Sequence, residues 1–495
     1  MLKRLINTIF TNCTDLKNRT VFLLLFVISF FLRLPFFFRD YVDRDESTFI
    51  LMGQSWVDGN LPYTELWDLK PPMAFLFFAG IIYVFGKSFI AIRVIGSIIV
   101  AITAFFTFKI GTVVHSKKIG ILSGGICVLL LTLFGSLQGV MSEHICMVFF
   151  MSGLYLLLKH QKSYWFLLSG LLMGMALMTK LNIAYTVLCC GLFIFYAGFS
   201  NKKVGNGILK GILFGAGILI VISLTIFPYY SNGITDLWWN SVVLAPLEYI
   251  DARRYSFLKL APIFIILFCF FLFSWKNKWL NLKDLKIQLL ITVILGILFA
   301  FYKGGRVNGH YLIQLHPILI ILVAMSLRRL NFIRKWKWNP LYLVLVMLIP
   351  MESYLEYGNI VKNKMERGTF FNGEGFSVPK HIQDNQLEIE NVLFLGYHIG
   401  YWNLDTKPPV KSATHPSNIC RDELFPFYGN PRETAIEELQ YIMETVQPKT
   451  IVTRKNRRVF GKEEIEENEY INAYLKAHYK VHATVENAEI LQRLK

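Results

Sequence analysis

Long apolar runs separated by short polar segments dominate roughly the first 350 residues. A membrane-spanning helix needs about 20 predominantly apolar residues, so this pattern predicts about eleven transmembrane helices. Residues 73–86 are also apolar, but this segment is short and follows Pro71-Pro72, and it is not counted as a span. The predicted spans lie near residues 21–38, 90–113, 119–137, 142–158, 164–179, 183–199, 208–228, 257–275, 287–302, 311–327 and 338–352.

After residue 352 the pattern changes to frequent charges and turn signals such as Asn372-Gly373. Segments 392–397 and 450–453 are typical of short buried strands, whereas 432–446 and 466–478 have helical periodicity. The fold class predicted is therefore a mainly α, polytopic membrane protein with a small C-terminal α/β domain. We predict a transmembrane domain at 1–352, with its first extracytoplasmic loop at 39–72, and an extracytoplasmic α/β domain at 353–495.

Composition and charge agree with a membrane protein. The 495 residues are 54% hydrophobic and only 17% charged, whereas ordinary soluble domains are about 25% charged. The net charge of +17 raises the possibility of nucleic-acid binding. However, the segments predicted to face the cytoplasm carry 20 Lys or Arg residues against Asp15 and Asp284 as the only acids, as the positive-inside rule requires. We therefore interpret the charge as an orientation signal in a cell membrane, inner or plasma, with a cytoplasmic N-terminus and no nucleic-acid partner.

The cysteines and histidines give no metal or disulfide signature. Most of the seven cysteines lie inside apolar runs, and none form a Cys-x-x-Cys pair. His310 alone could bind a metal, but a single histidine near a membrane surface is more often structural. The sequence requires no cofactor, and a divalent metal remains an open alternative.

Carboxylates and cations are predicted to meet at the outer membrane surface. Loop 39–72 contains Asp40, Asp43, Arg44, Asp45 and Glu46, followed by a Trp-Asp-Leu-Lys-Pro-Pro block at 67–72. A carboxylate can take the proton from an acceptor hydroxyl, while fixed cations stabilise a departing phosphate. The combination favours group transfer from a phosphate-linked donor. Further charged residues predicted at the same face are Glu143, Lys180, Arg253, Arg254, Arg306 and His310.

Several of these segments resemble a known family. The pair Asp45-Glu46, the Gly-x-x-Pro-Tyr segment at 59–63, the block at 67–72 and Arg93 near the start of the next span are similar to the first outer loop of GT-C glycosyltransferases. This superfamily includes protein O-mannosyltransferases and the aminoarabinose transferase of lipid A. Residues 170–180 and 304–317 resemble two further blocks, so the resemblance covers about residues 20–330. The chain departs from the family at Leu181, where glycine is frequent, and at His316-Pro317, where the family often has two prolines.

The resemblance implies a membrane glycosyltransferase with an inverting reaction and a polyprenyl-phosphate sugar donor. Asp45 would be the general base, with Asp43 as its rival, and Glu46 would shape the same site. Lys70 would meet the donor phosphate, and Arg253, Arg254 or Arg306 would complete the phosphate clamp. The acceptor would be a lipid, a glycan or a protein outside the cytoplasm. The substrate-binding residues implied are Asp43, Asp68, Lys70, Arg93, Lys180, Arg253, Arg254, Arg306, His310 and Tyr311.

Other functions remain as alternatives. A polymerase or ligase of lipid-linked oligosaccharides would use the same surface with a larger donor groove. A transporter would carry polar groups at mid-membrane and matching half-repeats, and neither feature is evident in the sequence. A membrane-anchored binding or sensor protein would not need Asp45, Lys70 and Arg306 together.

Overall fold

A computed structural model describes residues 15–40, 43–252, 258, 260–305, 307–330 and 348–494. Contacts between residues divide the chain into two compact units. Unit 1 comprises Met1–Leu34, Arg93–Thr225 and Arg253–Leu355. Unit 2 comprises Pro35–Ile92, Ile226–Ala252 and Glu356–Lys495. Each unit is therefore assembled from three separate stretches of the chain.

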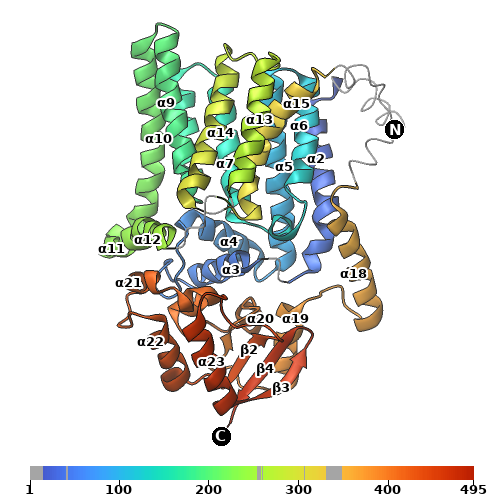
Figure 1. Cartoon of the computed structure of the whole chain (residues 1–495), viewed down its shortest axis with the longest axis vertical. Helices are drawn as coiled ribbons and strands as arrows, with labels where there is room; N and C mark the ends of the chain where they lie inside the picture. The colour runs from blue at the N-terminus through green and yellow to red at the C-terminus, as the bar shows by residue number, and fades with distance from the viewer. Residues whose placement is uncertain are drawn as a thin grey trace. The chain divides into compact units, whose positions relative to one another are not determined.

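Unit 1 consists of long apolar helices, most of which run side by side (Figure 1). Helix α10 continues beyond the unit, since it ends six residues after Thr225. The helices are α2 (Asn18–Arg33), α5 (Phe89–Val114), α6 (Lys117–Leu130), α7 (Ser142–Lys159), α8 (Ser163–Leu177), α9 (Ala184–Ser200), α10 (Val204–Ser231), α13 (Ala261–Lys276), α14 (Leu285–Gly304) and α15 (Leu312–Leu327).

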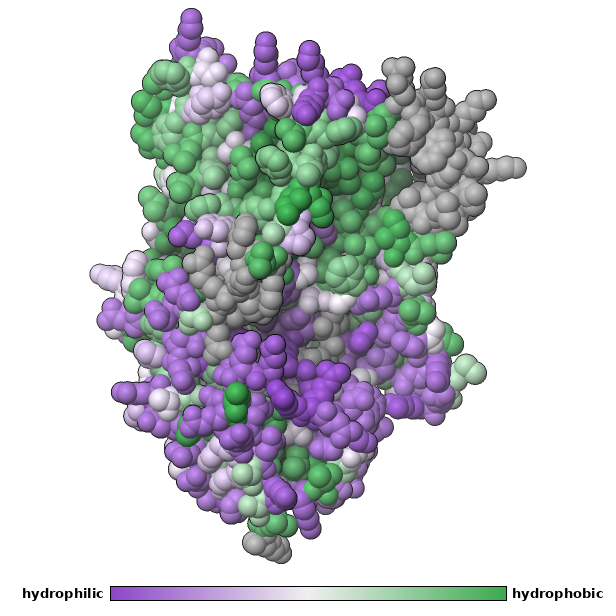
Figure 2. Space-filling view, viewed as in Figure 1, coloured by the Kyte–Doolittle hydropathy of each residue, from purple (hydrophilic) through white to green (hydrophobic). Residues whose placement is uncertain are grey.

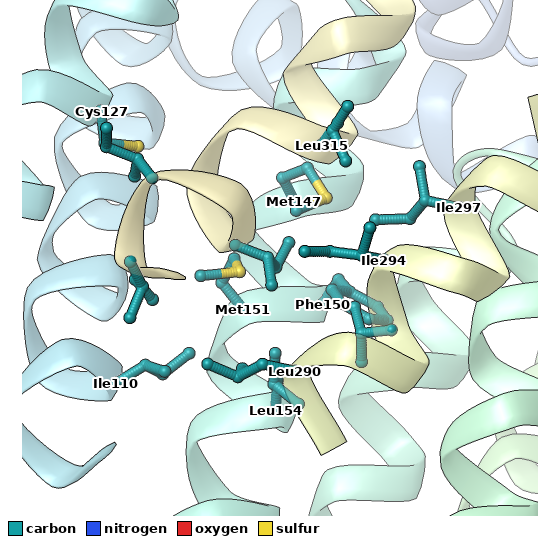
Figure 3. Close-up of a cluster of buried hydrophobic side chains, with 14 of the residues drawn as sticks. Ile110, Cys127, Met147, Phe150, Met151, Leu154, Leu290, Ile294, Ile297 and Leu315 are labelled. Carbon is teal, nitrogen blue, oxygen red and sulfur yellow. The ribbon is translucent and has the colours of Figure 1, made fainter. Parts of the chain in front are cut away.

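The core of unit 1 forms around α7. Met147, Phe150, Met151 and Leu154 occupy positions i, i+3, i+4 and i+7 along this helix and are completely buried, as expected for one face of a helix. Unbranched methionine side chains fill irregular gaps between neighbouring helices. Figure 3 shows these residues against side chains from α5, α6, α14 and α15, namely Ile110, Cys127, Leu290, Ile294, Ile297 and Leu315.

The outward faces of the helices are also apolar. On α10, for example, Ile212, Leu219 and Leu224 are each at least 60% exposed, and Figure 2 shows hydrophobic surface over the long helices. Such a face suits lipid contact rather than water. Seven helical stretches of the described chain are long and apolar enough to cross a membrane: Asn18–Phe38, Phe89–Val114, Ser142–Lys159, Leu181–Ser200, Val204–Ser231, Gly309–Leu327 and Leu285–Gly304.

The prediction of a multi-pass, mainly α membrane protein is confirmed. Three shorter apolar helices, Pro72–Phe85, Ser163–Leu177 and Ala261–Lys276, accompany the seven longer stretches. Most of the predicted span 338–352 lies outside the described residues. The count of eleven spans therefore stays a prediction.

Unit 2 contains one helix from the predicted first outer loop and a second helix from the short apolar segment that follows it. Helix α3 (Arg44–Val57) and helix α4 (Pro72–Phe85) pack closely, with Phe49 buried against Phe75 and Phe78. The close approach depends on Gly53, since a Cβ atom there would lie 2.8 Å from Phe78 Cβ. Short helices α11 (Thr235–Trp239) and α12 (Ala245–Ala252) also belong to unit 2, joined by a π-helical turn, Asn240–Leu244.

The C-terminal part of unit 2 is a small α/β structure, as predicted. Its four-stranded sheet has the order β1-β2-β4-β3, with β1 parallel to β2 and the other neighbours antiparallel. The strands are β1 (Leu393–Phe394), β2 (Thr450–Arg454), β3 (Tyr479–Val485) and β4 (Ala488–Arg493). The helices are α18 (Met351–Arg367), which begins in unit 1, α19 (Glu374–Asp384), α20 (Gly400–Leu404), α21 (Phe425–Tyr428), α22 (Ala435–Gln440) and α23 (Ile465–His478).

The division into units differs from the division predicted from hydropathy. The predicted boundary at residue 352 lies close to the start of the last stretch of unit 2 at Glu356. However, the first loop belongs to the same compact unit as the tail rather than to the helical unit. Hydropathy could not indicate this, because it reports which segments are apolar and not which loops pack together.

Candidate active site

The first turn of helix α3 presents two adjacent carboxylates. Asp43 is the N-cap residue: its backbone is extended, and its Oδ1 accepts a hydrogen bond from the Asp45 backbone N–H at 2.9 Å. Asp45 and Glu46 follow in the first turn, where the helix dipole favours negative charge. Glu46 is buried, with only 2% of its surface exposed. The local sequence therefore fixes Asp43 as the cap and Asp45 as the more accessible carboxylate.

The Asp45 carboxylate lies between two nitrogen groups. Lys70 Nζ is 3.5 Å from Asp45 Oδ2, and His415 Nε2 is 3.5 Å from Asp45 Oδ1. The Asp45 side chain remains 25% exposed. Asp45 is thus oriented from both sides and still open to an incoming hydroxyl, which is the geometry that a general base requires.

Lys70 is held by the turn that leads into α4. Asp68, which is buried, accepts a hydrogen bond from the Lys70 backbone N–H at 3.1 Å and lies 3.9 Å from Nζ. Tyr63 donates its hydroxyl proton to the Lys70 carbonyl at 2.6 Å. Pro71 and Pro72 then start α4, where proline is tolerated because no backbone N–H is needed. The ammonium also lies 5.7 Å from the centre of the Phe49 ring.

His415 comes from the tail and was not identified from the sequence. Its Nδ1 lies 2.7 Å from Ser417 Oγ. Burial lowers the pKa of His415 below its ordinary value of 6.5, although the nearby Asp45 carboxylate acts in the opposite direction. The imidazole is therefore neutral at pH 7. If Ser417 donates its hydroxyl proton to Nδ1, the ring proton is on Nε2, where it faces Asp45.

Further tail residues contact Thr48 in the second turn of α3 and Trp67 in the loop before α4. His398 Nε2 is 3.0 Å from Thr48 Oγ1, and Thr48 donates to the Thr414 carbonyl at 3.3 Å. Trp67 packs edge-to-face against Tyr428 with ring centres 4.7 Å apart. These contacts join residues about 350 positions apart, so no local motif marks them. The predicted site residues gathered in this group are Asp43, Asp45, Glu46, Asp68 and Lys70.

A second group of predicted residues lies in unit 1. Lys180 Nζ is 2.6 Å from Glu143 Oε1, and His310 Nε2 is 3.8 Å from the same oxygen. The Tyr311 ring lies 4.9 Å from Lys180 Nζ. The carboxylate of Glu143 is completely buried, so this ion pair satisfies two charges that would be costly alone. Lys180, His310 and Tyr311 are therefore neighbours in unit 1.

The remaining predicted residues are not placed in either group. Arg93 is buried near the start of α5 in unit 1. Arg253, Arg254 and Arg306 lie outside the described residues, so the choice of the clamp arginine stays a prediction. Within the described part of the chain, no three His, Cys, Asp or Glu side chains are grouped so that they could hold a metal ion.

Comparison with known proteins gives one family match and several similar folds. A sequence model of the dolichyl-phosphate-mannose-protein mannosyltransferase family matches residues 69–227, a segment that includes Lys70 and Lys180. The crystal structure of ArnT from Cupriavidus metallidurans bound to undecaprenyl phosphate superposes with a TM-score of 0.59 and 12% identity. The match covers 96% of this chain and 97% of that one. The chain has the fold of the GT-C superfamily.

Two other GT-C structures are also similar. The apo form of the same Cupriavidus protein has 13% identity and a TM-score of 0.56, again covering 96% and 97% of the two chains. The oligosaccharyltransferase AglB from Archaeoglobus fulgidus, in complex with an inhibitory peptide and a dolichol-phosphate, has 10% identity and a TM-score of 0.48. It covers 88% of this chain and 69% of that one. No curated protein matches the chain. The predicted GT-C-like fold is confirmed by the two Cupriavidus structures.

Proposed function

We propose that the protein is a membrane glycosyltransferase that transfers a sugar from a polyprenyl phosphate to a hydroxyl of an acceptor outside the cytoplasm. The observation that carries this proposal is the partly exposed Asp45 carboxylate beside the Lys70 ammonium. The GT-C fold supports the reaction class. The similar Cupriavidus protein binds undecaprenyl phosphate, which supports a polyprenyl-phosphate donor here. The proposed acceptor is a lipid, a glycan or a protein.

In the proposed reaction, the acceptor oxygen attacks the anomeric carbon of the sugar while its proton passes to Asp45. The bond between that carbon and the phosphate oxygen breaks, and the polyprenyl phosphate leaves with the electron pair. Attack opposite to the leaving group inverts the anomeric configuration. Lys70 would offset the charge that develops on the phosphate, since a fixed cation stabilises such charge most where water is partly excluded.

The proposal is tested by the products in cells. Lipids, glycans and intact proteins are compared by mass spectrometry between cells with the wild-type protein, cells lacking it and cells with Asp45→Asn. We expect one sugar mass to be missing from the same molecule in the last two strains. Asp384→Asn, an exposed aspartate at the end of α19, serves as the control and should retain the sugar. Identical products in all four strains would contradict a transferase function.

His415 is proposed to position Asp45 and to stabilise its ionised form. We expect His415→Leu to lower kcat by about 10- to 100-fold, the effect of losing a hydrogen bond to a charged group. His415→Gln keeps an N–H donor at similar reach and should restore part of the rate. The acidic limb of the rate profile should move to higher pH in His415→Leu, because the carboxylate loses a donor. Steady-state kinetics across pH, with the exposed His482→Leu as control, checks this.

A purely structural role for His415 predicts a different pattern. His415→Leu would then reduce the amount of folded protein without moving the pH profile. In an Asp45→Asn background, the positioning role predicts that His415→Leu has little further effect, since the two residues act on the same step. A full additional loss in the double variant would count against the assignment.

We also propose that the N-terminus faces the cytoplasm and that the tail lies outside the cytoplasm. On a background without native cysteines, Lys476→Cys on the exposed face of α23 should react with an impermeant maleimide in intact cells or spheroplasts. Lys203→Cys, on a loop predicted to face the cytoplasm, should react only after lysis. The reverse labelling pattern would invert the topology.

A further inference from the structure

A polar cleft lies at the carboxyl ends of the two parallel strands of unit 2. Its volume is about 600 Å³, within the range of sites for small molecules. Tyr397 follows β1, and Arg454, Lys455 and Arg457 occur at and after the end of β2. In α/β structures, ligands characteristically bind in the crevice beyond the carboxyl ends of parallel strands. The cleft is thus where this fold would hold a ligand.

One face of helix α18 forms the opposite wall. Glu356, Asn359, Asn363 and Arg367 line the cleft, at helical spacing along α18. The chain that enters α3 closes one side: Asp40 is buried and accepts a hydrogen bond from the Gly375 backbone N–H. A Cβ atom at Gly373 would clash with the Asp40 carboxylate, and the φ of +104° at Gly373 also favours glycine.

The acidic groups of the cleft are already engaged within its walls. Glu356 pairs with Arg39 at 3.6 Å, Glu366 with Lys362 at 3.8 Å, and Glu486 with Arg367. Glu374 accepts from Asn487 Nδ2 at 2.8 Å, and Asp40 accepts from Gly375. Each of the five carboxylates therefore has a partner within the walls of the cleft.

Three cations lie at and just after the end of β2. Arg454, Lys455 and Arg457 fall within four residues that contain no acid. Arg454 lies 5.6 Å from the centre of the Tyr397 ring. Lys455 and Arg457 are exposed, and within the described residues no carboxylate forms an ion pair with either. This side of the cleft consequently carries an excess of positive charge.

The other lining groups suit hydroxyls. Asn359, Asn372 and Asn487 each donate one hydrogen bond to a carboxylate of the cleft, and a primary amide has a second N–H and a carbonyl oxygen that can bind a hydroxyl. Burial and the nearby Glu374 carboxylate raise the pKa of Tyr397 to about 12, so its phenol stays protonated at neutral pH. A cleft with so few apolar groups does not suit a polyprenyl chain.

We infer that this cleft binds an anionic, polyhydroxylated group, such as a sugar or glycerol that carries a phosphate. Lys455 and Arg457 would bind the anion, and the asparagines would bind the hydroxyls. Asp40 and Asp45 are five positions apart in the sequence, so their Cα atoms are at most about 18 Å apart. On the proposed function, on which this role rests, the cleft would hold the anionic part of the acceptor while another of its hydroxyls reaches Asp45.

Binding is measured on the full chain in phosphatidylcholine nanodiscs by isothermal titration with glucose 6-phosphate, inorganic phosphate and glucose. A parallel measurement uses nanodiscs that contain phosphatidylglycerol, with competition by glucose 6-phosphate. We expect saturable binding of the phosphorylated sugar, or of the phosphatidylglycerol headgroup, and much weaker binding of glucose. The two arms separate a soluble source of the anion from a lipid headgroup.

The variant Lys455→Glu/Arg457→Glu should weaken this binding by about tenfold or more. Lys380→Glu/Lys476→Glu reverses two exposed lysines of the same unit that do not line the cleft, and it should bind like the wild type. Equal binding by both double variants, or no binding in either arm, would overturn the inference. Asp45→Asn should bind normally, so that a failure of the proposed transferase activity is distinguishable from a failure of the cleft.

Discussion

Asp45→Asn is expected to reduce sugar transfer by about 10²–10⁴-fold, the usual effect of removing a general base. The amide has nearly the same shape but cannot take the acceptor proton. The start of α3 should survive, because the hydrogen bond to Asp43 uses the backbone N–H of residue 45 and not its side chain. Expression, melting temperature and donor-lipid binding should therefore stay close to wild type while turnover is lost. Transfer assays in liposomes with undecaprenyl-phosphate-linked sugars check this.

Asp43→Asn provides the matched comparison. Asparagine is as good an N-cap as aspartate, so this change keeps the start of the helix while it removes a carboxylate two residues from Asp45. We expect Asp43→Asn to retain most activity. Loss of activity in Asp43→Asn together with full activity in Asp45→Asn would assign the base to Asp43.

Lys70→Ala is expected to lower kcat/KM for the donor by about 30- to 1,000-fold, corresponding to about 2–4 kcal/mol. The Lys70 side chain is only 16% exposed, and its ammonium lies near Asp45, Asp68 and the Phe49 ring. A cation in such a partly dry position acts strongly on a phosphate. Lys70→Arg should keep part of the activity, because the charge survives while the geometry changes. Donor kinetics in detergent or liposomes measure both variants.

The control for Lys70 is the same pair of changes at Lys203. This lysine is exposed in the connection between α9 and α10, on a loop predicted to be cytoplasmic. Lys203→Ala should leave donor kinetics unchanged, with at most a small effect on membrane insertion. If Lys70→Ala behaves in the same way, the phosphate is bound by other cations, and Arg253, Arg254 and Arg306 become the next candidates.

Apolar periodicity predicted most of the architecture. The segment predicted to be helical at 466–478 is α23, and the strand predicted at 450–453 is β2. The predicted strand at 392–397 is only two residues long, because Tyr397 takes a left-handed conformation and the chain turns away from the sheet. Strands β3 and β4 were not predicted. β3 alternates weakly, with most of its residues at least partly exposed, so its pairing with β4 determines the structure more than its own sequence does.

The candidate site, like the fold, could be predicted from the sequence only in part. Asp43, Asp45, Asp68 and Lys70 are close in sequence and could be grouped by their loop. The contact between Lys180 and Glu143 depends on how α7 packs against its neighbours, yet both residues were predicted near one surface. His398 and His415 could not be found, since their partners Thr48 and Asp45 lie about 350 or more residues earlier. Only the folded tail shows that these imidazoles face the start of α3.

The long separation between Asp45 and His415 has a consequence for biosynthesis. Chains are synthesised at about 5–20 residues per second, so roughly 20–70 s pass between translation of the two residues. During that interval the nascent protein already contains its proposed base but lacks the imidazole that orients it. We expect a ribosome-stalled chain that ends before residue 398 to insert into the membrane without gaining activity. The protein would then become active only after synthesis of the tail is complete.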